Sequence, residues 1–298
     1  MVRKKRISWG IVLIHIFFAL FSLAFVLPIL SVVSVSLTDE STLSSMGYSL
    51  IPRKFSTLAY EFIFSNPQEI FDGYKVTIFI SAVGTILSLF VTTAVAYSLS
   101  RKNFAYKKII TYYIFFTMLF SGGLVPSYIL QTQYLHLDNT VWIYILPSMV
   151  SAWNVIVVRT FMQGIPDALA ESAKIDGASE YRIYFQIILP LSKPVLATIG
   201  LMILLGKWNM WMESMLYIRN SRLYTLQYLL QKMLLEAQFA KNMANTMPES
   251  VMMLETVKVP SESMRFAMCV LAAGPMLVVF PFFQKYFSKG LTIGAVKG

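Results

Sequence analysis

Long apolar segments separated by short charged stretches constrain this chain more than any other feature of its sequence. An α-helix needs about 20 mostly apolar residues to cross a hydrocarbon core of about 30 Å. Only 13% of the residues are charged and 56% are hydrophobic, against roughly 25% charged in a typical soluble domain. The sequence therefore predicts an all-α membrane protein, a single domain over residues 1–298 with six transmembrane helices. The predicted spans are residues 9–34, 76–98, 109–130, 141–161, 195–218 and 266–287.

Basic residues indicate the orientation of these helices, because cytoplasmic loops of membrane proteins carry an excess of Lys and Arg. Residues 3–6 read RKKR, and four more bases lie within residues 101–108. Both stretches should be cytoplasmic, and six spans return the C-terminus to the same side. A basic N-terminus is also typical of a signal peptide, but this apolar segment is too long and no cleavage site follows Pro28. We therefore expect a multi-pass membrane protein with both termini in the cytoplasm.

The composition and motif content exclude several classes of function. The net charge of +10 could indicate nucleic acid, yet the bases cluster beside apolar segments, so we expect no nucleic-acid partner. The single cysteine, Cys269, excludes an internal disulfide and a cysteine-based metal cluster. The sequence contains no GxxxxGK[ST], HExxH, GxSxG or GxGxxG motif, and His15 and His136 lie in different segments. We predict no catalytic residue, no metal site and no enzymatic activity in this chain.

Two long connections should lie outside the cytoplasm. Residues 39–75 form a polar connection, and residues 219–265 form a long extracytoplasmic loop that contains six bases. Within this loop, apolar residues recur at helical spacing from Leu226 to Ala237, which predicts an amphipathic helix ending near Pro248. Such a helix either packs on the rest of the protein, which we favour, or binds a partner.

Polar side chains inside the fifth segment suggest a pathway through the membrane. A charge at the centre of a spanning helix costs about 2.5–3.5 kcal/mol, and this segment contains Lys207 and Glu213. Asn209 and Glu213 would share one face of a continuous helix, whereas Lys207 would lie about 200° from Asn209. The two tryptophans of the segment could stack on sugar rings, or could serve packing and interfacial anchoring. The predicted substrate pathway consists of Trp208, Asn209, Trp211, Glu213 and, in the fourth segment, Asn154.

Two further features lie within the predicted spans. Hydroxyl side chains at positions 77, 81, 85, 88 and 92 lie along one face of the second segment. This spacing is typical of close helix packing, which we favour, and is also compatible with a transport path. The run SGGLVPS at residues 121–127 interrupts the third segment. Irregular backbone at membrane depth is tolerated only inside protein or beside a wet cavity, so this break is a weaker candidate for the pathway.

The cytoplasmic connection at residues 164–190 is too polar to span a membrane and too regular for a linker. Pro166 suits the first turn of a helix, and Gly177 suits the left-handed backbone that ends one. The sequence therefore predicts a short helix, a sharp turn and a second helix that ends at Pro190. The predicted packing face of the first helix consists of Leu169, Ala170 and Ala173.

The spacing of residues in this connection resembles the EAA loop, the signature of bacterial ABC importer permeases. That resemblance implies the type I ABC importer permease fold, in which the loop is a coupling helix that docks into a cleft on the ATPase. Ser172 stands where the family has its middle alanine, a substitution of one small residue for another. The residues to which the resemblance assigns ATPase coupling are Glu171, Ser172, Ala173, Asp176, Gly177, Ile187, Leu189 and Pro190.

Nearly the whole chain is similar to maltose-type importers that handle oligosaccharides. The similarity rests on GYSLIPRKFSTLAY from Gly47, on the pair Trp208–Asn209, and on the ending FFQKYFSKGLTIGAVKG. The run FSGGLVPSYIL from Phe120 is shared with permeases for complex polysaccharide fragments. The resemblance implies the smaller, six-span permease of a bacterial cytoplasmic-membrane importer, working by alternating access on oligosaccharides. Acidic or plant-derived oligosaccharides are compatible with its external bases.

The resemblance also implies the partners of the chain. They are a second homologous permease, a dimer of cytoplasmic ABC ATPases that binds ATP and Mg, and an extracytoplasmic solute-binding protein, with no cofactor bound by this chain itself. Three alternatives stay open from the residues: a permease for amino acids or other small solutes, an ATPase-independent secondary transporter, and an intramembrane enzyme. The last would need a nucleophile or metal set within the spans, and the sequence contains none.

Overall fold

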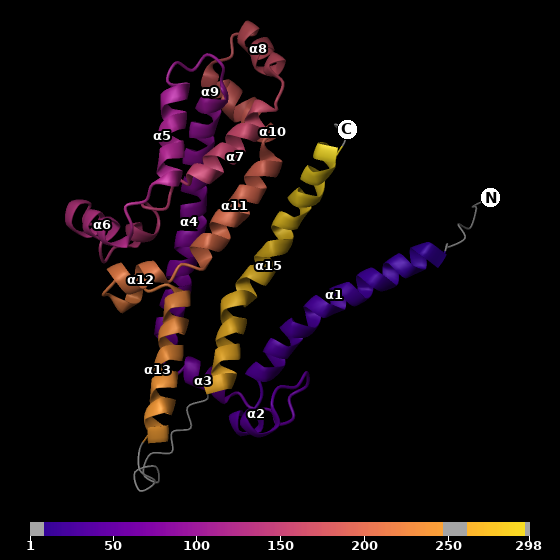
Figure 1. Cartoon of the computed structure of the whole chain (residues 1–298), viewed down its shortest axis with the longest axis vertical. Coiled ribbons are helices and arrows are strands. Elements are labelled where there is room, and N and C mark those ends of the chain that lie inside the picture. Colours follow the sequence, from indigo (N-terminus) through magenta and orange to yellow (C-terminus); the bar gives the residue numbers. More distant parts are fainter. Residues whose placement is uncertain (1–8, 247–260, 296–298) are drawn as a thin grey trace. The chain divides into compact units, whose positions relative to one another are not determined.

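The computed structural model describes residues 9–246 and 261–295, and these residues form helices and their connections, without a named β-strand (Figure 1). Short 3₁₀ or π turns occupy Leu130–Tyr134, Val141–Tyr144, Tyr184–Ile188 and Ser221–Leu223. The α-helices are α1 Trp9–Ser36, α2 Glu40–Met46, α3 Leu58–Ile63, α4 Pro67–Ser100, α5 Lys107–Leu119, α6 Leu124–Ile129, α7 Ala152–Gln163, α8 Asp167–Ile175, α9 Glu180–Ile183, α10 Leu189–Leu191, α11 Lys193–Trp208, α12 Met212–Tyr217, α13 Leu226–Thr246 and α15 Ser261–Ala295.

The chain divides into two compact units. The first unit comprises Met1–Pro67 and Leu230–Pro275, and the second comprises Gln68–Leu229 and Met276–Gly298. The second unit therefore contains α4 to α12, which include both the candidate pathway and the connection at residues 164–190. The single permease domain expected over residues 1–298 stays a prediction.

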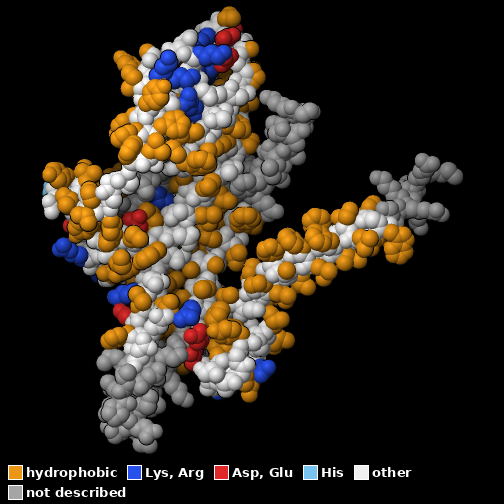
Figure 2. Space-filling model, in the orientation of Figure 1, with side chains coloured by type: hydrophobic (Ala, Val, Ile, Leu, Met, Phe, Trp, Pro, Cys, Tyr) orange, Lys and Arg blue, Asp and Glu red, His pale blue; other side chains and the backbone are white. Residues whose placement is uncertain are grey.

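Within residues 9–246 and 261–295, three helices are long and apolar enough to cross a membrane: Trp9–Ser36, Pro67–Ser100 and Glu262–Phe282 within α15. The predicted spans 9–34, 76–98 and 266–287 all fall within α1, α4 and α15, so their helical structure is confirmed. Apolar side chains cover the visible face of α1 (Figure 2), and most of its Leu, Ile and Phe side chains are exposed. Such a surface suits a helix that meets lipid, since lipid tails solvate apolar side chains.

The other three predicted spans are broken. Helix α5 and the Leu124–Tyr134 segment are bent by 116°, which confirms the break expected at residues 121–127. The segment Glu180–Leu191 is bent by 79° from α11, and counting each bent pair as one span gives up to five spans. The six-span count therefore stays a prediction.

The continuous helices predicted at residues 141–161 and 195–218 are wrong. A 3₁₀ turn at Val141–Tyr144 is followed by irregular chain, and α7 starts only at Ala152. Pro147 lies in this irregular chain and has no backbone N–H for a helical hydrogen bond. With 12 residues, α7 is about 18 Å long, which is too short to cross the hydrocarbon core alone. The fifth segment breaks after Trp208, where α11 ends.

A buried apolar core holds the helices of the second unit together. It includes Val155 and Val158 of α7, Ile183 of α9 and Ile199 of α11, all at most 2% exposed. The C-terminal end of α4 contributes Leu99 to the same cluster. Because α8 and α9 pack on this core as well, the 164–190 connection is attached to the ends of three longer helices.

The hydroxyl stripe of α4 is buried, which confirms its expected role in packing. The five side chains at positions 77 to 92 are at most 7% exposed. Gly84, on the same helix, lies where an added Cβ would come within 3.2 Å of the Lys207 Cε. Gly200 of α11 lies similarly close to Leu89 of α4. Small residues thus allow α4 and α11 to approach closely.

The amphipathic helix predicted at residues 226–237 is α13, and the apolar residues Leu226, Leu229, Leu230 and Ala237 on one of its faces are buried. In the second unit, the Leu226 backbone N–H donates to Thr77 Oγ1 at 2.9 Å, and Leu229 packs against Gly73 of α4. Leu230 and Ala237 are also buried. Of the two alternatives for this helix, packing on the rest of the protein is therefore confirmed. The predicted helix end near Pro248 lies outside the described residues.

In the first unit, a carboxylate caps the start of α15. Glu40 accepts hydrogen bonds from the backbone N–H groups of Glu262 and Ser263, both at 3.0 Å. The Tyr48 hydroxyl donates to Glu262 at 3.2 Å. An acidic side chain at a helix N-terminus satisfies free N–H groups and opposes the positive end of the helix dipole. The segment after α1 is therefore fixed to the first turn of α15.

The contact between Gly73 and α13 predicts a cost for any larger residue at that position. A Cβ at Gly73 would lie 2.6 Å from Leu229 Cδ1 and 3.4 Å from the Leu226 Cα, whereas one at Gly206 meets nothing within 4 Å. Gly73→Val should destabilise the protein by about 1–3 kcal/mol through overpacking. Gly206→Val is the matched control, and equal thermal unfolding midpoints for the two purified variants would contradict the packing described here.

Candidate functional site

The connection at residues 164–190 folds into a helix, a left-handed turn and a second helical segment. Pro166 directly precedes α8 with an extended backbone, one position earlier than expected, and Asp167 lies in the first turn. Gly177 has φ +77°, which confirms that it ends this helix. The Ala178 N–H then donates to the Ala173 carbonyl at 2.9 Å. The second segment ends at Leu191 rather than Pro190 and contains a π turn.

One face of α8 packs inward and the other is exposed. Ala170 is buried and Ala173 packs against the same core, as expected, but Leu169 is 44% exposed and does not belong to the packing face. The difference follows from helix geometry, because residue 169 lies 100° away from residue 170. Ile175 is 88% exposed on the outward face, and the side chains of Glu171, Ser172 and Asp176 are exposed as well.

The residues assigned to coupling therefore divide between surface and core. Ile187 and Leu189 join the buried core together with Ala173, and Pro190 is exposed in α10. The inward members hold the connection on the transmembrane helices, and the outward members are free to contact another protein. Their role in coupling stays a prediction.

Charged side chains of this connection form two ion pairs, one with the loop after α4 and one within the connection. The Lys102 ammonium lies 2.7 Å from the Asp167 carboxylate, and Lys174 pairs with Glu180 at 2.5 Å. The hydrogen bond and charge of Lys102 lower the pKa of the Asp167 carboxyl, and Asp167 in turn raises the pKa of Lys102. Both groups therefore stay charged at neutral pH. Figure 2 shows basic and acidic side chains gathered at this end of the second unit.

A polar pocket of about 470 Å³ lies between α8 and the end of α4. Its lining includes Arg101, whose guanidinium carbon lies 4.5 Å from the centre of the Tyr97 ring. The sequence analysis used Arg101 only as one of the bases that indicate orientation and did not assign Arg101 or Tyr97 to a site, because the contact between α4 and α9 leaves no local motif.

The residues predicted to line the substrate pathway do not form a single helical face. The chain leaves helical geometry at Asn209 and re-enters it at Met212, so Asn209 and Glu213 do not share the face of one helix. Trp208 is 2% exposed and cannot stack on a sugar. Asn209 and Trp211 are exposed, whereas Glu213 and Asn154 are partly buried.

Lys207 has a structural partner set that the sequence did not reveal. Its ammonium donates to the Tyr144 carbonyl at 2.5 Å, to the Ser148 hydroxyl at 2.6 Å and to the Ile145 carbonyl at 3.5 Å. The side chain is 3% exposed, and its stem lies against Gly84. A buried cation thus supplies hydrogen bonds to the irregular chain before α7. The charge inside an apolar segment was the only sequence signal for this contact.

A small cavity of about 100 Å³ lies where the broken segments meet. Glu213, Gln131 and Ser148 supply polar groups to it; Ser148 and Glu213 come from the fourth and fifth predicted spans, and Gln131 lies in the π turn directly after the third. Of these, only Glu213 was assigned to the pathway from the sequence. Gln131 and Ser148 lie in irregular or π-helical chain, whose path could not be predicted from periodicity.

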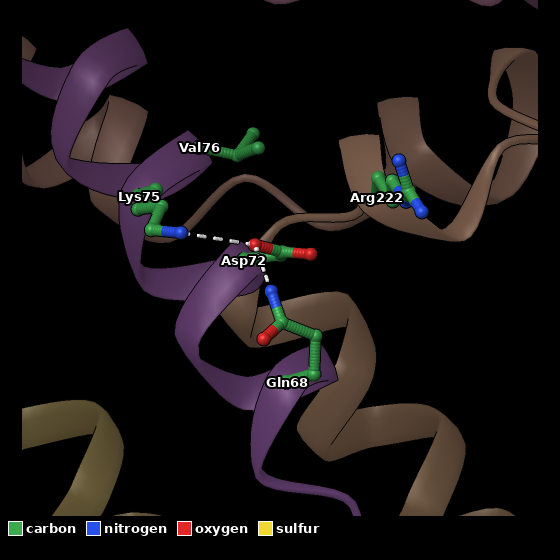
Figure 3. A pocket seen from close by; sticks show the side chains of 5 residues that line it. All are labelled: Gln68, Asp72, Lys75, Val76 and Arg222. Carbon is green, nitrogen blue, oxygen red and sulfur yellow. Dashed lines mark hydrogen bonds and ion pairs between the residues drawn. The ribbon is translucent and has the colours of Figure 1, made fainter.

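A second polar pocket, of about 370 Å³, opens at the start of α4 (Figure 3). Asp72 accepts hydrogen bonds from Gln68 at 3.0 Å and from Lys75 at 3.3 Å, and Arg222 faces it from the Ser221–Leu223 turn. Lys75 and Arg222 give this pocket two cations beside one carboxylate.

Comparison with known proteins identifies the family. The family model described as the inner membrane component of binding-protein-dependent transport systems matches residues 2–293. The chain belongs to this family. Membership makes it a transport component of a membrane, with an ATPase and a substrate-binding protein as partners.

Several similar proteins are named for the transport of polysaccharides or oligosaccharides. The polygalacturonan/rhamnogalacturonan transport system permease protein YtcP of Bacillus subtilis is 37% identical, over 96% of this chain and 97% of the relative. The arabinooligosaccharides permease protein AraQ of the same organism is 29% identical, over 95% and 94%. A crystal structure of a bacterial ABC transporter for import of the acidic polysaccharide alginate covers 96% of this chain and 99% of the solved one. Its TM-score is 0.76 at 26% identity.

Removing the Lys207 ammonium should destabilise the irregular chain before α7. Lys207→Met keeps the length of the side chain but leaves the Tyr144 carbonyl without its charged donor. We expect a loss of about 1.5–3 kcal/mol, the usual value of a hydrogen bond to a charged group. Lys75→Met, which removes an exposed ion pair with Asp72, should cost about 1 kcal/mol or less. Thermal unfolding of the purified variants measures both, and a Lys207→Met midpoint as high as that of Lys75→Met would contradict the structural role.

Proposed function

We propose that the chain is a permease subunit of an ATP-binding-cassette importer that moves oligosaccharides across the bacterial cytoplasmic membrane. The observation that supports this most directly is the two-faced helix α8. Its Ala170 face packs on the core of the transmembrane helices, and Ile175 and Glu171 face outward. A helix attached on one side and exposed on the other suits docking to a separate ATPase.

The substrate we propose is an acidic oligosaccharide derived from a plant-type polysaccharide. One relative is named for the transport of polygalacturonan and rhamnogalacturonan, and the solved structure is named for import of the acidic polysaccharide alginate. Both kinds of polysaccharide carry carboxylates. On the outer side of this chain, Arg219 and Arg222 together with Lys75 offer cations to such a substrate or to its carrier. The names of the relatives favour sugars over amino acids as substrates.

The proposed assembly pairs this chain with a second, homologous permease and with two copies of a cytoplasmic ATPase. ATP and Mg would bind to the ATPase, so this chain needs no cofactor and performs no hydrolysis itself. An extracytoplasmic solute-binding protein would deliver the sugar. The proposed orientation has both termini in the cytoplasm, as the basic residues at 3–6 and 101–108 indicate.

The proposed mechanism is alternating access. Closure of the ATPase pair would move α8, and the core shared by α4, α7 and α11 would transmit that motion as a rigid body. The broken segments around Glu213 and Ser148 provide irregular backbone next to a cavity, as transporter sites require. Each ligand must favour a different conformation, since a ligand shifts an equilibrium only by its difference in affinity for the two states.

An alternative is a secondary transporter that works without an ATPase. Membership in a binding-protein-dependent family argues against it. Purification distinguishes the two, because only the importer should bring an ATPase with it.

Reversing the exposed charge on α8 should detach the ATPase. In mild detergent, the tagged wild-type chain should co-purify with a second permease and an ATPase, identified by mass spectrometry. With Glu171→Lys, recovery of the ATPase should fall at least tenfold, because the new charge and longer side chain disturb the docking face. Glu236→Lys on the exposed surface of α13 is the control and should retain the ATPase. Recovery of the wild-type chain alone, under conditions that preserve other membrane complexes, would support a secondary transporter.

Straining the turn after α8 should impair transport more than folding. Gly177 has φ +77° with nothing within 4 Å of an added Cβ, so Gly177→Val costs backbone strain of about 1–3 kcal/mol without a clash. We expect sugar uptake to fall at least about fivefold while membrane insertion is kept. Gly47→Val is the matched control, because Gly47 has φ +72° and the same open surroundings. Wild-type uptake by Gly177→Val would contradict the coupling role.

A further inference from the structure

A single carboxylate, Glu180, joins three elements at the end of the second unit. One of its oxygens accepts a hydrogen bond from the Tyr97 hydroxyl of α4 at 2.6 Å. Its other oxygen pairs with the Lys174 ammonium of α8 at 2.5 Å. Glu180 itself is the first residue of α9, directly after the turn at Gly177. The two arms of the 164–190 connection are therefore bonded to each other and to α4 through one side chain.

The contact continues from Tyr97 into the interior of the unit. The Tyr97 and Tyr184 rings lie 5.0 Å apart, and the Tyr184 hydroxyl is 2.7 Å from Thr93 Oγ1. Both tyrosines are less than 10% exposed. The guanidinium carbon of Arg101 also lies over the Tyr97 ring, 4.5 Å from its centre. The ring of Tyr97 is thus fixed on α4, and its hydroxyl is the point at which α4 meets Glu180.

The two bonds of Glu180 differ in their surroundings. The side chains of Lys174 and Glu180 are each 51% exposed, and a solvent-exposed ion pair contributes little because water and salt screen it. The hydrogen bond to Tyr97 ends on a buried ring that cannot move without moving α4. Its geometry is therefore set by the transmembrane helix and not by solvent.

We propose that Glu180 is the positioning residue that ties movement of α8 to α4. This proposal rests on the proposed function. When the ATPase moves the docked helix α8, the carboxylate of Glu180 is the link through which α8 moves the transmembrane helix α4. Without the link, α8 still has its apolar contacts through Ala170 and Ala173, so docking and folding remain. What is lost is the fixed distance between Lys174 of α8 and Tyr97 of α4.

The experiment compares the complete importer, purified with its ATPase and reconstituted in proteoliposomes with its binding protein, in wild type and variants. The readout is the number of sugars imported per ATP hydrolysed. Tyr97→Phe removes only the hydroxyl and keeps the ring contacts with Tyr184 and Arg101, and Glu180→Ala removes the carboxylate that accepts from this hydroxyl. The matched controls are Tyr106→Phe, an exposed tyrosine after the same loop, and Glu236→Ala on α13.

We expect both variants to co-purify with the ATPase at the wild-type ratio, to hydrolyse ATP, and to import about tenfold less sugar per ATP. A tenfold loss lies within the usual range of coupling between sites. The double variant should be no worse than the more affected single one, because both changes break one contact. The exchange Lys174→Glu with Glu180→Lys restores a pair of opposite charges, with Tyr97 as acceptor, and should recover part of the ratio.

Three results would overturn the proposal. The first is a wild-type number of sugars imported per ATP in Tyr97→Phe. The second is a double variant whose loss of this ratio equals the sum of the two single losses. The third is loss of the ATPase or of thermal stability in both single variants, which would make the contact purely structural. Failure of the proposed function looks different, because the wild-type complex itself would then lack the ATPase or fail to import oligosaccharide.

Discussion

The structure of the second unit depends on one constraint: backbone N–H and C=O groups at membrane depth have no water to bond with. Continuous helices such as α4 meet this requirement within themselves. The chain before α7 does not, and the ammonium of Lys207 provides donors for the carbonyls of Tyr144 and Ile145. This single side chain lets irregular backbone exist next to the cavity at Ser148. A buried charge that looks costly in the sequence therefore supplies the hydrogen bonds that a non-helical segment needs.

The sequence predicted those parts of the fold that follow from local pattern. Apolar length located α1, α4 and α15, helical spacing located α13, and the Gly177 turn ended α8 as expected. Each of these signals is contained within about 20 residues. The predictions failed at residues 141–161 and 195–218. They rested on hydropathy, which measures how apolar a segment is and not whether it is helical.

The candidate site was predictable to the same extent. The coupling connection has a motif, so its residues could be named in advance, although Leu169 proved to be exposed. The predicted pathway has no motif: Trp208 is buried, and Ser148 and Gln131 line one cavity although they lie in different irregular or π-helical segments. The hydrogen bond between Glu180 and Tyr97 joins residues 83 positions apart. Such long-range contacts cannot be predicted from the pattern of a single sequence.

The close approach of Gly84 to Lys207 also has an evolutionary consequence. The lysine stem occupies the space that a side chain at position 84 would fill, so the two positions share one volume. A descendant that replaced Lys207 by a short residue would leave a void beside α4 and two carbonyls in need of a donor. A hydroxyl or amide side chain at position 84 could fill the void and supply the donor at once. Positions 84 and 207 should therefore change together among descendants of this protein, and a change at only one of them should be rare.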